Sequence, residues 1–325
     1  MPKAIRIHET GGPEVLRFEE VAVGDPGPGQ ARVRHGAVGV NFVDIYHRTG
    51  LYPLRLPSGI GTEAAGRVEA VGPGVAHVTP GDRVVYLSTA EVGSYAEVRL
   101  VPSDVLVRLP PRITDEVAAA AFLKGLTVRS LVRRTYPVKA GEVVLWHAAA
   151  GGVGLIAVQW LKALGATVIG TVGSDEKADL VRSLGCDHVV VYTREDFVAR
   201  VKEITGGAGV PVVYDSVGQA TFDGSLSCLR PLGMMVTFGN ASGLVPPVAP
   251  AMLSQKGSLF LTRPSVGHYL AARPDLEGAA EDLFGQLEAG RIQVRVGGRW
   301  PLGQAAEAQR ALADRRTSGS LVLLP

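Results

Sequence analysis

The pattern of apolar and polar positions changes near the middle of the chain. From about residue 141 onward, short apolar runs alternate with segments that carry an apolar residue every three or four positions. The short runs are typical of buried parallel strands, and the periodic segments of helices that cover them. This alternation predicts a doubly wound parallel sheet with right-handed crossovers. The predicted strands lie near 143–147, 167–172, 188–191, 210–214, 233–238 and 258–261, and the predicted helices near 152–164, 175–184, 195–205 and 220–229.

Residues 1 to about 123 show strand-like runs separated by Gly/Pro turns, which predicts a compact, barrel-like β domain. These runs lie at 31–40, 64–71, 83–87 and 95–100. After about residue 267 the pattern predicts a helix (276–289), a strand, a second helix (303–315) and a last strand (320–323). We expect the last strand to return to the N-terminal domain. The predicted domains are therefore 1–123 with 268–325, β-rich and catalytic, and 124–267, a nucleotide-binding insertion.

A glycine-rich turn joins the first predicted strand of the alternating region to its helix. It reads Ala149-Ala150-Gly151-Gly152-Val153-Gly154. Small residues let a dinucleotide pyrophosphate approach the backbone N–H groups at a helix N-terminus. Alone, such a hexapeptide also fits an ordinary tight turn, and Ala149 stands where the first glycine of the fingerprint usually lies. Its place between two strands, at the start of a helix, predicts dinucleotide binding by residues 150–153.

The end of the second predicted strand indicates which dinucleotide is bound. NAD enzymes usually carry an acidic residue about 20 residues beyond the glycines, where it binds the ribose 2′-hydroxyl. Here Gly173 and Ser174 end the strand, and Lys177 follows one helical turn later. A hydroxyl and an ammonium group would attract a 2′-phosphate. Asp175 and Glu176 fit the start of a helix, and Lys177 alternatively reads as a solvated helix charge. The pattern favours NADPH.

Composition narrows the class of protein. A chain of 325 residues fits two domains, and 46% hydrophobic with 20% charged residues is typical of a globular protein. The net charge of +2 argues against a nucleic-acid partner. We expect no membrane segment and no export signal, because no apolar run of sufficient length occurs. The two cysteines, Cys186 and Cys228, suggest a reducing cytoplasm.

Several motifs resemble the medium-chain dehydrogenase/reductase superfamily. They are 11–16 (GGPEVL), 61–66 (GTEAAG), 81–84 (GDRV), 149–154 and 213–218 (VYDSVG). Within it, 39–44 (GVNFVD), 123–127 (LKGLT) and the glycine turn are similar to the zinc-free NADPH:quinone oxidoreductases, the zeta-crystallin group. The resemblance implies an N-terminal GroES-like domain beside a Rossmann sheet, and a homodimer paired through the strand near 259–261.

The chain departs from the zinc-dependent branch of that superfamily. Asn41 stands where that branch has a cysteine, and Thr62 where it has a histidine. An amide and a hydroxyl are not usual Zn²⁺ ligands, and no histidine pair shows the spacing of helical zinc ligands. We therefore expect no metal. His147, just before the glycine turn, is predicted to be a packing residue.

Without a Lewis acid, the protein is expected to reduce a compound that is already electrophilic. A quinone meets this requirement, because hydride (or electron) transfer from nicotinamide C4 gives an aromatic hydroquinone. We expect the site in the cleft between the domains. The candidate catalytic residues are Asn41, Tyr46, Tyr52, Thr62 and Lys124. The two tyrosines suit a flat ring, although both also fit ordinary core or loop packing.

The resemblance implies further cofactor contacts at later strand ends and before the glycine turn. They are Asn41, Thr127, Ser130, Tyr192, Ser216, Phe238, Gly239, Asn240, Ser242, Thr262 and Arg263. A lone arginine such as Arg263 alternatively forms a surface ion pair.

Two other functions stay open on the sequence alone. Zinc-free relatives also reduce activated C=C bonds, in 2-alkenals or enoyl thioesters, and that reaction needs a proton donor for carbon. Crystallin relatives suggest a third function, that of a non-catalytic NADPH-binding or structural protein.

Overall fold

The computed structural model describes all 325 residues, and the chain forms two compact units. The first unit contains Met1–Lys124, Leu270–Glu288 and Val294–Pro325. The second unit contains Gly125–Tyr269 and Ala289–Gln293. The division falls inside one helix, α2 (Asp115–Ser130).

The first unit is built around a mainly antiparallel sheet, in which only β15 and β16 pair parallel. The strand order is β15-β16-β3-β5-β6-β8, with β7 also paired to β3. The bounds are β3 Gln30–Val40, β5 Glu63–Val71, β6 Arg83–Leu87, β7 Val98–Pro102, β8 Leu106–Arg108, β15 Val296–Pro301 and β16 Ser320–Leu324. A smaller sheet pairs β1 (Lys3–Ile7) with β2 (Arg17–Glu20) and β4 (Ser58–Gly59). Side chains such as Ile5, Val33, Val84 and Leu321 fill the core between these strands.

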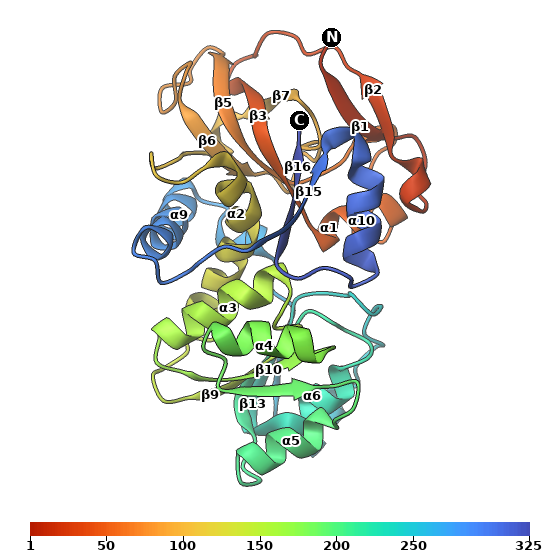
Figure 1. The fold of residues 1–325 in the computed structure, drawn as a ribbon, viewed down its shortest axis with the longest axis vertical. Coiled ribbons are helices and arrows are strands. Elements are labelled where there is room, and N and C mark those ends of the chain that lie inside the picture. Colours follow the sequence, from red (N-terminus) through yellow and green to blue (C-terminus); the bar gives the residue numbers. More distant parts are fainter. The chain divides into compact units, whose positions relative to one another are not determined.

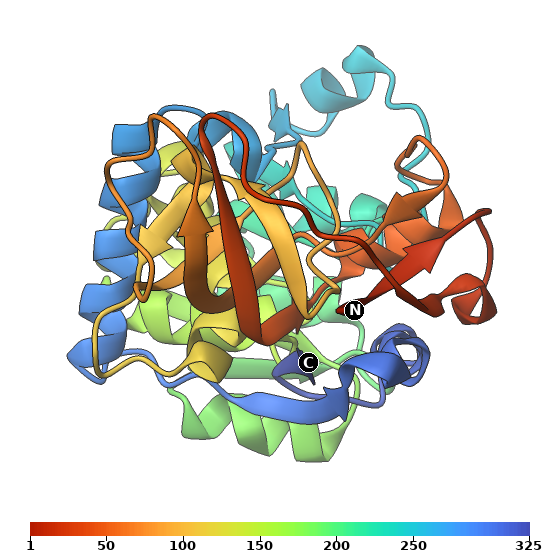
Figure 2. The same ribbon diagram turned by 90° about the horizontal axis from the view of Figure 1, so that it is seen from above.

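The last strand completes this unit, as expected. β16 pairs antiparallel with β3, with Leu321 opposite Val40, so the C-terminal strand lies between β15 and a strand from the start of the chain. Both ends of the chain lie in this unit (Figure 1 and Figure 2). The predicted strand at 95–100 instead begins at Val98. The Tyr95 carbonyl accepts the backbone N–H of Ile5, and the Tyr95 N–H donates to the Ile60 carbonyl. The backbone of Tyr95 therefore pairs with segments other than β3, the partner of β7.

Four helices accompany these strands: α1 (Phe42–Thr49), the first part of α2, α9 (Arg273–Glu288) and α10 (Ala305–Ala313). Single 3₁₀ turns lie at Pro13–Val15, Ser103–Val105 and Leu302–Gln304. The sequence pattern predicts neither α1 nor α2. α1 is amphipathic but has only two turns, too few for its period to be recognised, and α2 is buried on most sides and shows no clear polar face. No helix in the chain combines the length and the apolar character needed to cross a membrane.

The second unit is the predicted doubly wound parallel sheet, in the order β11-β10-β9-β12-β13-β14. The strands are β9 Val143–Trp146, β10 Thr167–Val172, β11 His188–Val191, β12 Val210–Asp215, β13 Leu229–Thr237 and β14 Phe260–Thr262. α3 (Gly152–Ala163) and α4 (Asp175–Ser183) cover one face, and α5 (Phe197–Ile204) and α6 (Phe222–Cys228) the other (Figure 1). Further helical segments are Leu131–Thr135, which continues α2, α7 (Pro250–Gln255) and α8 (Val266–Tyr269).

Close packing between β10 and the glycine turn explains why alanine is tolerated at position 149. Ala149 is buried, and its backbone N–H donates to Thr171 in β10. A Cβ placed on Gly170 would lie 2.9 Å from the Ala149 Cβ and 2.9 Å from the Cys186 Sγ. The methyl group of Ala149 therefore occupies space that a glycine in the neighbouring strand leaves free.

We predict that Gly170→Ala destabilises the protein by about 1–3 kcal/mol, because an added methyl group overpacks a buried site. Ala149→Gly in the same chain should restore part of the loss. Gly285→Ala, in α9 with no atom within 4 Å of the added Cβ, is the control and should be neutral or slightly stabilising. Thermal unfolding of the four proteins measures this. An unchanged midpoint for Gly170→Ala would contradict the packing account.

Candidate functional site

The glycine turn of the second unit presents the start of α3 without a side-chain cap. Gly151 is the N-cap residue of α3, and no side chain hydrogen-bonds to the first turn. Ala148 adopts a left-handed backbone conformation (φ 54°), which turns the chain sharply after β9. A Cβ on Gly154 would collide with the backbone carbonyls of Ala148 and Ala149. Open backbone N–H groups at a helix N-terminus form an anion site, so this geometry fits a pyrophosphate at residues 150–153.

A chain of buried hydrogen bonds fixes the strands that end beside this turn. His147 contacts the Thr171 hydroxyl through Nδ1 (2.9 Å) and the Ser225 hydroxyl through Nε2 (2.9 Å). Ser225 in turn donates to Asp215 Oδ2 (3.0 Å), at the end of β12. Burial lowers the pKa of His147, so its ring is neutral. His147 is thus the packing residue that the sequence predicts, with both ring nitrogens in hydrogen bonds.

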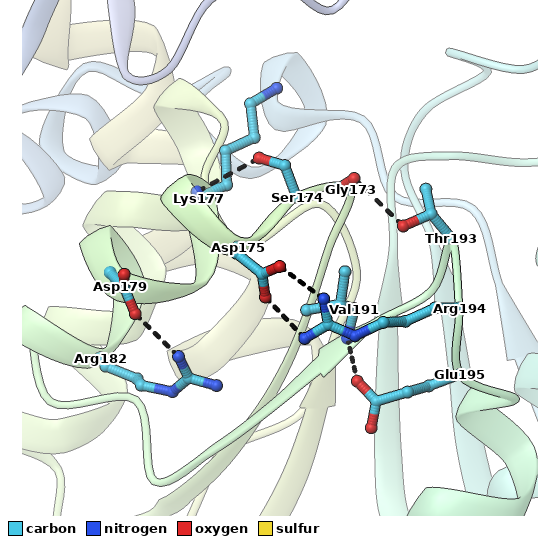
Figure 3. A network of polar contacts seen from close by, with 10 residues as sticks. All are labelled: Gly173, Ser174, Asp175, Lys177, Asp179, Arg182, Val191, Thr193, Arg194 and Glu195. Atoms are coloured by element: carbon cyan, nitrogen blue, oxygen red, sulfur yellow. Dashed lines mark hydrogen bonds and ion pairs between the residues drawn. The ribbon is translucent and has the colours of Figure 1, made fainter.

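The end of β10 gathers the candidate 2′-phosphate residues (Figure 3). The Ser174 hydroxyl caps α4 by accepting the backbone N–H of Lys177 at 3.3 Å. A Cβ on Gly173 would lie 2.8 Å from the Tyr192 hydroxyl, so Tyr192, which is 43% exposed, lies against the same turn. The structure therefore brings Gly173, Ser174, Lys177 and Tyr192 together.

The later strand ends carry the remaining candidates of the second unit. Arg263 Nη1 donates to the Thr237 hydroxyl (3.2 Å) and to the Gly239 carbonyl (2.9 Å). With its amide oriented to satisfy both atoms, Asn240 accepts from Arg263 Nη2 at 3.0 Å. Arg263 therefore joins these strand ends through neutral groups. Cofactor contact at these positions stays a prediction.

Other cofactor candidates of this unit have structural contacts of their own. Ser242 donates to the Val217 carbonyl (2.8 Å), and Phe238 packs on Trp146 with ring centroids 5.5 Å apart. A Cβ on Gly239 would collide with the backbone of Ser216, and Thr262 pairs with Val236 in the sheet. Thr127 and Ser130 lie on α2, and the buried Ser130 hydroxyl has no hydrogen-bond partner. An orphaned hydroxyl of this kind fits a missing ligand atom.

In the first unit, a buried carboxylate binds two of the candidate catalytic residues, Asn41 and Lys124. Glu63 is fully buried at the start of β5. Its Oε1 accepts from Asn41 Nδ2 (2.7 Å) and from Lys124 Nζ (3.1 Å), and its Oε2 accepts the backbone N–H of Leu123 (2.7 Å). Gly39 supplies the room, because a Cβ there would collide with Glu63. These contacts fix the Asn41 amide and neutralise a buried charge.

A second buried carboxylate lies next to this cluster. Asp44 Oδ2 accepts the backbone N–H of Asn41 (2.8 Å) and the Tyr95 hydroxyl (2.9 Å), and Thr62 donates to Oδ1 at 3.4 Å. Burial raises the pKa of Asp44 to about 7, although both close donors lower it. Of these residues, Thr62 was predicted from the sequence, whereas Glu63, Asp44 and Tyr95 were not. Their acidic and phenolic groups carried no sequence signal beyond membership of the 61–66 and 39–44 motifs.

Tyr46 and Tyr52 form the aromatic part of this region. Tyr46 lies on α1, and Tyr52 follows the helix, with its backbone N–H bonded to the Tyr46 carbonyl (3.0 Å). Their rings meet edge to face, with centroids 5.2 Å apart, and His47 packs on Tyr52 at 5.9 Å. Tyr46 is buried and Tyr52 is half-buried. Tyr52 therefore combines ring packing with an accessible edge, as an aromatic substrate site requires, whereas Tyr46 packs behind it in the core.

We predict that Asp44→Asn changes how stability depends on pH. Because its folded pKa is raised, Asp44 contributes stability that is complete below its unfolded pKa of 3.8 and is lost as pH rises through about 7. Glu63, Lys124 and Tyr95 face the same group and are unchanged. The melting temperature of the variant, relative to wild type, should therefore rise between pH 4 and 7 and then level off.

Asp82→Asn is the contrasting control. The backbone N–H of Thr79 holds the pKa of Asp82 below its usual value. The melting temperature of wild type, relative to Asp82→Asn, should therefore rise as the pH increases from acid values. A pH-independent difference between Asp44→Asn and wild type would contradict the prediction for Asp44.

Two family models match the chain, one described as an alcohol dehydrogenase GroES-like domain (residues 27–111) and one as a zinc-binding dehydrogenase (152–283). A zinc ion does not fit the residues present. Asn41 and Thr62 are poor zinc ligands, and the Lys124 cation beside Glu63 would repel a divalent ion. No group of three or more His, Cys, Asp or Glu side chains in the chain could hold a metal ion.

Relatives match over the whole length. A quinone oxidoreductase from Pseudomonas aeruginosa is 50% identical over 326 residues, with both chains covered completely. A 2-haloacrylate reductase from Burkholderia is 47% identical over 332 residues, covering 100% of this chain and 99% of the other. The crystal structure of Escherichia coli quinone oxidoreductase complexed with NADPH matches with a TM-score of 0.98 at 50% identity, covering 99% of this chain and 100% of that one. As its motifs predict, the chain belongs to the quinone oxidoreductase family of the medium-chain dehydrogenase/reductases.

Proposed function

We propose that this protein is an NADPH-dependent quinone reductase that works without a metal. The observation that carries the proposal is the buried Asn41–Glu63–Lys124 cluster, in which Asn41 stands at the position where the resemblance puts a zinc-binding cysteine. An ion pair and an amide at that place position a substrate but supply no strong Lewis acid. The uncapped start of α3 and the orphaned Ser130 hydroxyl support a dinucleotide in the second unit.

The proposal gives each unit a separate task. The β-rich domain, 1–123 with 268–325, binds the quinone, and residues 124–267 bind NADPH. When bound, NADPH supplies the hydride that, with a proton from water, converts a quinone to its hydroquinone. The start of α3 binds the pyrophosphate, and Ser174, Lys177 and Tyr192 hold the 2′-phosphate.

On the substrate side, Asn41 presents an amide that Glu63 keeps in one orientation. Lys124 and Thr62 complete the polar wall, and Tyr46 and Tyr52 supply aromatic faces for a flat ring. Positioning of this kind converts binding into rate without any essential general base. A reducing cytoplasm fits the proposal, because both cysteines are unpaired and buried.

One specific observation favours a second candidate, the reduction of activated C=C bonds. The Burkholderia relative that is 47% identical is a 2-haloacrylate reductase. Such a reduction ends with a proton delivered to carbon, and Tyr46 and Tyr52 are the two residues of the aromatic cluster that carry a hydroxyl group. A purely structural, non-catalytic function has no such support, and quinone-dependent oxidation of NADPH would exclude it as the sole function.

We predict faster turnover of 1,4-benzoquinone than of a 2-alkenal or 2-chloroacrylate at matched concentrations with NADPH. Tyr46→Phe and Tyr52→Phe should each lower quinone turnover by less than about tenfold, because hydroquinone oxygens take protons from water. Steady-state NADPH oxidation measures both. Faster alkene turnover, together with a larger loss in a phenylalanine variant, would favour the second candidate and reject the first.

We also propose a homodimer that pairs through β14. This strand has only three residues, lies at the edge of the parallel sheet and carries Phe260, which is 56% exposed. An edge strand with an exposed aromatic residue is a ready site for pairing with a second copy.

We predict that light scattering during gel filtration gives twice the mass of one chain. Phe260→Asp should shift the protein toward the monomer, because a charge in the paired strand opposes burial. Leu244→Asp replaces another exposed apolar residue of the second unit (57% exposed) and should leave the dimer intact. A wild-type mass of one chain would refute the proposal.

A further inference from the structure

The residue that begins α4 opposes the proposed cofactor. Asp175 follows Ser174 directly, at the end of the second strand of the nucleotide fold. A carboxylate in this region commonly binds the ribose 2′-hydroxyl of NAD. It would repel a 2′-phosphate, which carries about −1.5 to −2 charges near neutral pH. Glu176, which is also exposed, follows it. Lys177 alone would thus face two carboxylates on the same helical turn.

Arg194 neutralises one of these two carboxylates, that of Asp175, by forming an ion pair with it. Its Nη1 and Nη2 donate to Asp175 Oδ2 (2.5 Å) and Oδ1 (2.6 Å), so both oxygens of the carboxylate are used (Figure 3). These hydrogen bonds also hold the pKa of Asp175 below its usual value, so the pair stays ionised at neutral pH. The side chains are 55% and 65% exposed. A pair this exposed contributes little to folding, so its main effect is on local charge.

The backbone around Arg194 holds the guanidinium group in this position. The Tyr192 N–H donates to the Val172 carbonyl (3.1 Å), and the Thr193 hydroxyl donates to the Gly173 carbonyl (3.3 Å). Glu195 accepts the backbone N–H of Val191 (2.8 Å), which closes the turn that follows β11. Arg194 is therefore anchored against the same strand end that carries Ser174, whereas Lys177 points away from the Asp175–Arg194 pair (Figure 3).

We propose that Arg194 determines cofactor specificity: by occupying both oxygens of Asp175, it disables a ribose-hydroxyl acceptor and leaves Ser174 and Lys177 to hold the 2′-phosphate of NADPH. The inference rests on the proposed function, because it assumes that NADPH binds at this strand end. It adds a residue from the segment after β11 that lies outside the glycine turn and outside α4.

The test measures equilibrium binding of NADPH and of NADH, by titration of cofactor fluorescence with the full-length protein and no quinone. Arg194→Ala should weaken NADPH binding about three- to tenfold, as expected for a partly solvated charge interaction, and leave NADH within about twofold or tighter. Asp175→Asn in the same chain should restore NADPH binding, because the uncompensated carboxylate is gone. The loss of NADPH affinity caused by Arg194→Ala should be smaller at 0.5 M salt, because salt screens the charge interaction.

The matched control is an arginine on α4, the helix that Asp175 begins. Arg182 pairs with Asp179 at 2.9 Å and is likewise exposed, so Arg182→Ala removes the same charge further along α4 (Figure 3). It should leave the ratio of the two affinities unchanged. Lys177→Ala should weaken NADPH selectively whether or not Arg194 matters, and so tests the 2′-phosphate site by itself.

Equal weakening of both cofactors by Arg194→Ala, or no change in their ratio, would overturn the inference while leaving the proposed function intact. Failure of wild type to bind NADPH would instead defeat the proposed function. If Arg194→Ala does not fold, Arg194→Gln with Asp175→Asn keeps the turn and isolates the charge. NADPH binding by that double variant at less than a third of the wild-type affinity would also count against the inference.

Discussion

A buried carboxylate needs a partner for each oxygen, and much of the first unit follows from that requirement at Glu63. Its three donors come from the start of α1, from a backbone N–H of α2 and from Lys124. Removing one partner of such a buried pair typically costs about 3–5 kcal/mol. The cluster therefore holds the Asn41 amide in one orientation. It also explains Gly39, whose missing side chain leaves room for the carboxylate.

The second unit obeys a different constraint, which is close approach of backbone at the ends of parallel strands. Gly154 and Gly170 leave the space that the turn and Ala149 occupy. The hydrogen bonds from His147 to Thr171 and, through Ser225, to Asp215 hold the ends of β9, β10 and β12 at a fixed spacing. An open helix start can bind an anion only if this surrounding backbone stays in place. The buried histidine thus supports the binding surface without any need to touch the ligand.

The charges at the end of β10 show how the same fold can be made to prefer NADPH or NADH. The carboxylate of Asp175 and the ammonium group of Lys177 start the same helix and favour different riboses. Arg194, which comes from another segment, decides between them by binding the carboxylate at both oxygens. The distances and the exposure of this pair indicate a local electrostatic effect, in which the stability of the fold is hardly involved.

The sequence by itself determined the architecture, because its elements are specified by local periodicity. The six parallel strands, the four covering helices and the return of the last strand to the N-terminal unit all follow from runs that can be recognised along the chain, whereas its pairing with β3 is seen only in the structure. The glycine turn and the substitutions at Asn41 and Thr62 likewise identified the dinucleotide fold and the missing zinc ligands. Helices α1 and α2 were not predicted, because α1 is too short for its period to be recognised and α2, which is buried on most sides, lacks a clear polar face.

Only the tertiary structure decided which charges meet. Glu63 and Lys124 are 61 residues apart, and Asp175 and Arg194 are 19 apart. No local spacing rule connects such pairs, because their contact is made by the sheet order and by turns between strands. The sequence suggested how the chain folds and which cofactor it favours. The fold placed the partners that hold the Asn41 amide and neutralise Asp175, since electrostatic interactions depend on distance in space and not on separation along the chain.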